Sequence, residues 1–161
     1  MARQPKQAHI FLYRKRQGVW EYAVFQRSDL QTCWQGVCGG LEDAETFEEG
    51  ARRELFEEAG ISEPLPMYEM ECVSYLPTGI FSPRARERWG KEVVVIPMKY
   101  FSMPYDGPIK LSEEHTDVRW LPYRQAYKRL YFDDQKIALY ELNERLLRGL
   151  LPDPEEKEQQ S

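Results

Sequence analysis

Cysteine is scarce in this chain. Cys33, Cys38 and Cys72 are its three cysteines, an odd number whose spacing fits neither a disulfide framework nor a common zinc site. Thiols of this kind are usually buried as small apolar groups. The missing disulfide pattern predicts a protein of a reducing compartment, the cytoplasm.

Long hydrophobic runs are also missing. No apolar stretch approaches the roughly 20 residues that span a bilayer. The opening residues, MARQPKQAHIF, are too polar for the core of a secretory signal. The sequence therefore predicts no interaction with a membrane.

Positive charge is in the minority. The chain has 22 Lys and Arg against 27 Asp and Glu, which gives a formal net charge of −5 at pH 7. This balance argues against stable nucleic-acid binding, which needs an excess of positive charge. A small anionic ligand would need a local attraction, from a metal ion or from a basic patch. The composition specifies no oligomeric state.

What the sequence does contain is a succession of short apolar segments typical of strands. The chain has 161 residues, enough for one domain with a core, which we place at residues 1–150. A hairpin loop is expected around Gly18, and the nearly continuous run EVVVIPMKYF is typical of a central strand covered on both faces. The expected strands occupy residues 8–13, 22–27, 34–39, 67–76, 92–101 and 117–122.

Helical signals follow the third of these strands. Thr46 and Glu49 form a capping box, and Gly60 is suited to end a helix in the left-handed conformation. A helix is therefore expected over about residues 47–59. Strands and helices in this order indicate an α/β or α+β fold, a mixed sheet with helices.

The pattern turns helical again near the end of the chain. Asp133 or Asp134 is suited to cap a last helix that runs to about Arg148. The polar residues 151–161 are expected to form a solvated, disordered tail.

The helix at residues 47–59 concentrates negative charge. In GGLEDAETFEEGARRELFEEAGI, residues 39–61, seven of 23 residues are glutamates. Spacings of three and four place Glu54, Glu57 and Glu58 on one face, and Arg53 can pair with one carboxylate but not with all three. The face is either a solvated acidic surface or a site for a hard divalent cation.

The same stretch fills the signature of a known family. The motif of the Nudix hydrolases is G-x5-E-x7-R-E-U-x-E-E-x-G-U, in which U is a bulky aliphatic residue. All nine specified positions match, namely Gly39, Glu45, Arg53, Glu54, Leu55, Glu57, Glu58, Gly60 and Ile61. The chain thus resembles a Nudix hydrolase over about residues 5–148. The resemblance implies an α/β/α sandwich, with a mixed sheet between helices.

The resemblance also implies roles for the motif. Family members use water to split a P–O–P bridge in substrates built on a nucleoside diphosphate, with Mg²⁺ or Mn²⁺ as cofactor. The implied metal ligands are the carboxylates of Glu54, Glu57 and Glu58 and the backbone carbonyl of Cys38. Arg53 would orient these carboxylates, and Glu45 would be its ion-pair partner. Ala44 stands where many members have glycine, which is a departure in the loop before Glu45.

Three short segments resemble one branch of the family, the enzymes that convert dATP or dihydroneopterin triphosphate to the monophosphate and pyrophosphate. They are WQGVCG at residues 34–39, Glu92 at the start of its expected strand, and EEHTDVRWL at residues 113–121. Pro77 is a competing signal, because ADP-ribose pyrophosphatases often have a proline at a similar distance past the motif. We favour the simpler interpretation of Pro77 as an ordinary loop proline. Hydrolysis of ADP-ribose or of a dinucleoside polyphosphate stays an alternative.

Residues outside the motif supply further catalytic candidates. A water that attacks phosphorus needs a proton acceptor, and Glu114 is the first choice. Glu92 and a helix glutamate such as Glu54 are the alternatives. Glu114 together with His115 could supply the general base or a further metal ligand, and the alternative for His115 is a hydrogen bond within its loop.

Substrate-binding candidates are fewer. Arg27 at a strand end could hold phosphate, or it could be an exposed arginine. Trp34 could stack on a base, or it could pack at the edge of the sheet. The segment SPRARERWGKE is either a phosphate-attracting rim or a solvated loop, and its basic residues are Arg84, Arg86, Arg88 and Lys91.

Two classes of function remain from the sequence. One is a metal-dependent pyrophosphohydrolase that acts on a small nucleotide, and the other is a non-catalytic sensor of nucleotide metabolites on the same fold. The complete set of Arg53, Glu54, Glu57 and Glu58 favours the enzyme, because a sensor has no chemical need for all four.

Overall fold

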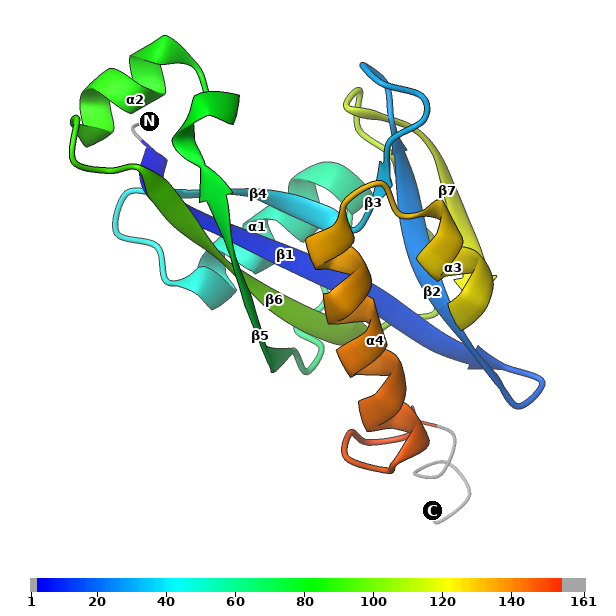
Figure 1. The fold of residues 1–161 in the computed structure, drawn as a ribbon. Coiled ribbons are helices and arrows are strands. Elements are labelled where there is room, and N and C mark those ends of the chain that lie inside the picture. The colour runs from blue at the N-terminus through cyan, green and yellow to red at the C-terminus, as the bar shows by residue number, and fades with distance from the viewer. Residues whose placement is uncertain (1–2, 155–161) are drawn as a thin grey trace.

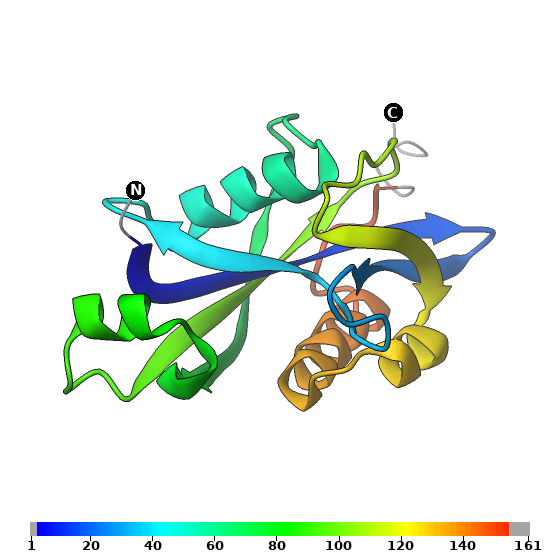
Figure 2. The ribbon, with the colours of Figure 1, turned by 90° about the horizontal axis from the view of Figure 1, so that it is seen from above.

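The computed structural model describes residues 3–154, so residues 155–161 of the tail predicted at 151–161 lie outside the described residues. A mixed sheet forms the middle layer, with α1 on one face and α3 and α4 on the other (Figures 1 and 2). This is the expected sandwich. The strands are β1 (Arg3–Arg16), β2 (Val19–Arg27), β3 (Trp34–Gln35), β4 (Val37–Glu42), β5 (Tyr68–Pro77), β6 (Val95–Pro104) and β7 (His115–Pro122). The helices are α1 (Phe47–Ala59), the 3₁₀ turn η1 (Thr78–Ile80), α2 (Pro83–Trp89), α3 (Tyr123–Arg129) and α4 (Asp133–Leu147).

The long strand β1 organises the sheet. It is parallel to β6 on one side, and on the other side it pairs with β4 through Ile10 and with β2 from Tyr13 onward. β2 continues away from β1 to pair with β3 and β7. The sheet therefore forks where β4 and β2 part, and the C-terminal half of α1 lies beside β4 near this fork (Figure 2).

Alternate residues of β1 face two separate cores, as the two-residue period of a strand requires. Phe11 and Tyr13 belong to the cluster under α4, which includes Leu139. Ile10 and Leu12 belong to the cluster under α1, which includes Leu55. Both layers of helices are thus anchored to the same strand.

The acidic helix has the predicted limits. Its capping box is formed, with Thr46 Oγ accepting from the Glu49 backbone N–H at 3.1 Å and the Glu49 carboxylate accepting from the Thr46 N–H at 3.0 Å. Gly60 ends the helix with a φ of 70°. Ala44, which stands where many family members have glycine, adopts a φ of 66°, so the loop keeps the left-handed turn with an alanine.

Several segments differ from the expectation. The loop expected at residues 14–21, between the first two strands, is much shorter, because the strands continue to a tight turn at Gln17 and Gly18, both with positive φ. The strand expected at residues 34–39 is broken at Gly36 into β3 and β4, which pair with different strands. The basic segment folds as α2 rather than as a loop.

The predicted start of β6 and the predicted N-cap of α4 are also wrong. β6 begins at Val95, so Glu92 lies in the turn before the strand and does not open it. The N-cap of α4 is Phe132, without a side-chain cap. Asp134 lies inside the first turn, where its carboxylate accepts from the Tyr100 hydroxyl at 2.9 Å and from the Gln135 N–H at 3.0 Å.

The residues after α4 fold back on the domain. Leu151 packs against the cluster under α4, and Asp153 pairs with Lys15 of β1 at 2.8 Å. The three cysteines are free; Cys33 is buried, and Cys38 and Cys72 are partly buried. Among the described helices, none is long and apolar enough to cross a membrane.

Candidate active site

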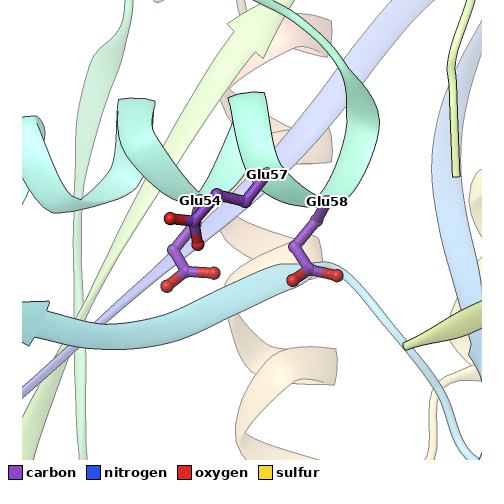
Figure 3. Close-up of side chains that lie close together, drawn as sticks. All are labelled: Glu54, Glu57 and Glu58. Carbon is purple, nitrogen blue, oxygen red and sulfur yellow. The ribbon is translucent and has the colours of Figure 1, made fainter. Parts of the chain in front are cut away.

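Three glutamates of α1 bring their carboxylates together. Glu54, Glu57 and Glu58 each offer an oxygen within 4.8 Å of the others (Figure 3). Glu54 and Glu58 are each only 4% exposed, whereas Glu57 faces solvent. Buried carboxylates this close repel one another unless positive charge lies between or beside them.

Arg53 provides part of that charge. Its guanidinium forms a two-point pair with the Glu45 carboxylate, at 2.8 and 3.1 Å. The same group donates to Glu54 at 2.9 Å and to Glu57 at 3.1 Å, and its other terminal nitrogen donates to the backbone carbonyl of Gly40 at 2.8 Å. One guanidinium thus ties the loop before α1, strand β4 and two carboxylates into one unit.

Gly39 leaves room for the Glu54 carboxyl group. A Cβ at this position would lie 2.2 Å from Cδ of Glu54 and 2.3 Å from its Oε1. The first glycine of the motif therefore has a steric reason, since any side chain would displace a carboxylate of the cluster. Gly60 at the end of α1 has a conformational reason, its positive φ.

Replacing Gly39 by alanine is expected to lower both the melting temperature and the hydrolytic activity, because Glu54 must move to admit the methyl group. Overpacking of this kind typically costs about 1–3 kcal/mol, and thermal unfolding measures it. Gly79 is the matched control, because no heavy atom lies within 4 Å of its Cβ position. Equal melting temperatures for Gly39→Ala and Gly79→Ala would contradict this role of Gly39.

The protonation of Glu54 depends on its burial. Loss of hydration raises the pKa of Glu54 to about 7, although the hydrogen bond and positive charge of Arg53 act in the opposite direction. The ionised carboxylate is therefore costly in the protein alone. An additional cation at the cluster would stabilise it.

Glu58 is held from the loop before β7. Ser112 Oγ donates to its carboxylate at 2.8 Å, and His115 Nδ1 lies 3.1 Å from the same oxygen. Burial lowers the pKa of His115, which favours the neutral imidazole. Ser112 was missed by the sequence analysis, because a lone serine in a loop carries no recognisable spacing.

Glu114 lies beside the same carboxylate. Partial burial and then the negative charge of Glu58 raise the pKa of Glu114. The structure thus brings Glu114 and His115 to the C-terminal half of α1. A carboxylate with a raised pKa is a better proton acceptor at neutral pH.

A pocket of about 440 Å³ opens beside these residues, at the fork of the sheet. Glu114 and His115 form one part of its wall, and Cys38 forms another. Burial raises the pKa of the Cys38 thiol to about 12, so the thiol stays protonated. Arg27 also lines the pocket, where its guanidinium pairs with Asp29 at 2.8 and 2.5 Å.

Two other candidates lie away from this pocket. Trp34 is 6% exposed and packs in the cluster under α4, with the guanidinium groups of Arg119 and Arg129 at 5.5 and 4.9 Å from its ring centre. Its ring is therefore not free to stack on a base, and the packing alternative holds. Glu92 is not among the pocket residues.

The residues of the cluster fit a divalent cation. Arg53 offsets one of the converging negative charges on Glu54 and Glu57, whereas Glu58 has the neutral hydroxyl of Ser112 and the imidazole of His115 beside it. The donors are all carboxylate oxygens, which hard ions such as Mg²⁺ and Mn²⁺ prefer.

The comparisons with known proteins identify the family. The NUDIX domain family matches residues 3–142. The chain is 37% identical over 158 residues to an RNA pyrophosphohydrolase of Sulfurovum sp. (strain NBC37-1), covering 91% of this chain and 95% of that protein. It is 29% identical over 127 residues to the dihydroneopterin triphosphate diphosphatase of Escherichia coli K12, covering 74% and 82% of the two chains.

A solved structure agrees with these relatives. A protein of Listeria monocytogenes described as a NUDIX hydrolase superposes with a TM-score of 0.80 at 32% identity, over 91% of this chain and 97% of that one. The chain belongs to the Nudix family and is a Nudix hydrolase.

Proposed function

We propose that the protein hydrolyses a nucleoside or pterin triphosphate to the monophosphate and pyrophosphate, with Mg²⁺ at the glutamate cluster. The observation that carries this proposal is the convergence of the carboxylates of Glu54, Glu57 and Glu58 beside Glu114, which lines the adjoining pocket. We also propose a cytoplasmic location, because the three cysteines are free thiols. Residues 1–150 are proposed as a single domain.

Each side chain has a part in this reaction. A bound divalent ion would supply positive charge at the phosphate oxygens and make water more acidic. Arg53 fixes the carboxylates of Glu54 and Glu57, and Ser112 fixes that of Glu58. The backbone carbonyl of Cys38 is proposed as a further ligand of the ion.

Glu114 is proposed as the proton acceptor. Water attacks one phosphorus of the bridge, the P–O bond to pyrophosphate breaks, and the proton of the water passes to the Glu114 carboxylate. Arg27 is proposed to exchange its partner Asp29 for a phosphate oxygen, because Asp29 is exposed and easily displaced. A guanidinium binds phosphate in the same two-point geometry as carboxylate.

The names of the relatives support a triphosphate as the substrate. One relative is a diphosphatase of dihydroneopterin triphosphate. The more similar one is an RNA pyrophosphohydrolase, which favours the 5′-triphosphate of an RNA as a second candidate. Both candidates present a terminal triphosphate to the site.

A substrate screen tests the proposal. We expect wild-type protein with Mg²⁺ to release pyrophosphate, and little orthophosphate, from dATP, dihydroneopterin triphosphate or a 5′-triphosphorylated oligonucleotide. Pyrophosphate and orthophosphate are measured separately, so the position of the broken bond is read directly. Turnover of ADP-ribose alone, with no triphosphate hydrolysed, would overturn the proposal and favour the interpretation of Pro77 as a substrate signal.

A further inference from the structure

A second pocket of about 320 Å³ lies between the start of β1 and α2. Polar residues of β1 form one wall, and α2 with the segment before it forms the other. The residues that carry the argument are Arg3, Gln7, Phe81, Arg84, Arg88 and Trp89. We refer to this pocket as the α2 groove.

The α2 groove gathers positive charge that has no partner within the described chain. Arg84 and Arg88 are one helical turn apart, and Arg3 faces them from β1. Among residues 3–154, no acidic side chain forms an ion pair with any of the three. In a chain with a net charge of −5, three unpaired guanidinium groups around one cavity favour an anionic ligand.

The acidic residues near the groove do not neutralise it. Glu42 and Glu45 lie close to the start of β1, but their carboxylates turn to Arg53, at 3.8 and 2.8 Å. Glu87 is exposed on α2 and does not line the groove. The charge of Arg3 also acts on the carboxylates of Glu45 and Glu54, so Arg84 and Arg88 are the guanidinium groups most available to a ligand.

The groove is already formed in the ligand-free protein. The Trp89 indole N–H donates to the backbone carbonyl of Arg3 at 2.9 Å, which fastens α2 to β1. The Phe81 ring meets Trp89 edge to face, with ring centres 5.3 Å apart. Both rings are only half-buried, so the cations stand beside aromatic surface. Such a combination suits a phosphate with an attached nucleoside.

The groove borders the glutamate cluster. The Arg3 side chain lies against Gly40 of β4, with Cδ 3.2 Å and Nη1 3.3 Å from the position of a Cβ there. The carbonyl of Gly40 accepts from Arg53, and the preceding Gly39 faces Glu54. Since neighbouring residues of a strand point to opposite faces, Arg3 and Glu54 lie on opposite sides of β4 at adjacent positions.

We propose that the α2 groove is a second phosphate subsite, which binds a phosphate of the substrate beyond the triphosphate that reacts. This inference rests on the proposed function. Guanidinium groups hold phosphate oxygens by charge-assisted hydrogen bonds, and such a phosphate has two sources. One is the phosphodiester that follows the first nucleoside of a 5′-triphosphorylated oligonucleotide, and the other is the far nucleotide of a dinucleoside polyphosphate.

The test compares three probes, namely ATP, the triphosphorylated dinucleotide pppApG and diadenosine tetraphosphate. The variants are Arg88→Ala and its matched control Arg86→Ala, which removes the same charge from an exposed position of α2 outside the groove. For at least one extended probe, the ratio of its kcat/KM to that of ATP is expected to fall about tenfold in Arg88→Ala, because the variant removes a charge-assisted hydrogen bond that only the extended probe makes. Arg86→Ala is expected to keep the wild-type ratio.

The outcomes are distinct. A fall for pppApG alone identifies the phosphodiester, and a fall for diadenosine tetraphosphate alone identifies the second nucleotide. The subsite would be overturned if Arg88→Ala and Arg86→Ala had the same ratio of kcat/KM for the extended probes to that for ATP. It would also be overturned if Arg88→Ala lowered kcat/KM equally for all three probes.

If the wild-type protein hydrolyses none of the probes, the groove is tested by binding, and the substrate screen with dATP and dihydroneopterin triphosphate decides the proposed function separately. Calorimetric titration with pppApG in the presence of a chelator measures the groove without turnover. Weaker binding in Arg88→Ala than in Arg86→Ala supports the subsite, and equal binding contradicts it.

Discussion

Replacement of Glu57 and Glu58 by glutamine is expected to abolish the rise in melting temperature that Mg²⁺ gives to the wild-type protein. An ion that binds only the folded state stabilises it by about 1.4 kcal/mol at ten times its dissociation constant. For a chain of this size, that free energy corresponds to a rise of about 3–6 °C. The variant keeps the shape of both side chains but loses two of the three converging negative charges, so the ion loses most of its attraction.

Glu48→Gln is the matched control for this experiment. Glu48 lies on the same helix, is exposed, and has only a long ion pair of 3.7 Å with Arg52. The control is expected to keep the full Mg²⁺-induced shift. A shift that persists in the double variant would show that the ion binds elsewhere. A wild-type protein with neither a shift nor activity at millimolar Mg²⁺ would show that the cluster is not a metal site.

Glu114→Gln is expected to lower kcat by at least about 10²-fold, the usual scale for removal of a general base. The neutral amide cannot accept the proton of the attacking water. The metal-induced rise in melting temperature should persist, because the carboxylates of α1 remain. Steady-state kinetics of triphosphate hydrolysis and thermal unfolding of the same preparation measure the two effects.

Glu113→Gln is the control for Glu114, since it makes the same chemical change one residue earlier at an exposed position. It is expected to stay near the wild-type kcat. An active Glu114→Gln together with an inactive Glu92→Gln would transfer the role to Glu92, despite its place in the turn before β6. If neither substitution matters, a helix glutamate such as Glu54 is the base.

Local chemistry made much of the fold predictable. The capping box at Thr46 and the left-handed Gly60 fix α1 from interactions within a few residues of sequence, and the structure has both. The apolar run of β6 predicted a strand inside the sheet, and β6 lies between β1 and β5. In each case the decisive interaction is local or depends on the hydrophobic pattern alone.

The segments that were predicted wrongly depend on distant partners. β3 and β4 are separate strands because the chain changes its partner from β2 to β1 at Gly36, which no local pattern records. The N-cap of α4 is Phe132 rather than Asp133 or Asp134, and the Asp134 carboxylate accepts a hydrogen bond from Tyr100 of the distant strand β6. Helix α2 is fastened by the bond from Trp89 to the backbone of β1.

The candidate site shows the same division. Convergence of the α1 glutamates followed from helical spacing, and the cluster is present. Ser112 contacts Glu58, and the Glu54 carboxyl group occupies the space where a side chain at Gly39 would lie. Both contacts depend on how separate elements pack together, so the sequence alone could not predict them. Burial of Trp34 could not be inferred because strand-edge aromatic residues occur both in cores and at ligand sites.

The central claim is that Glu54, Glu57 and Glu58 bind a divalent ion that the hydrolytic reaction requires. Calorimetric titration with Mg²⁺ at pH 8, where Glu54 is mostly ionised, tests this claim most directly. The structure predicts saturable binding in the wild-type protein and no measurable binding in the Glu57→Gln, Glu58→Gln variant. Absence of binding in the wild type, or equal binding in both proteins, would contradict it.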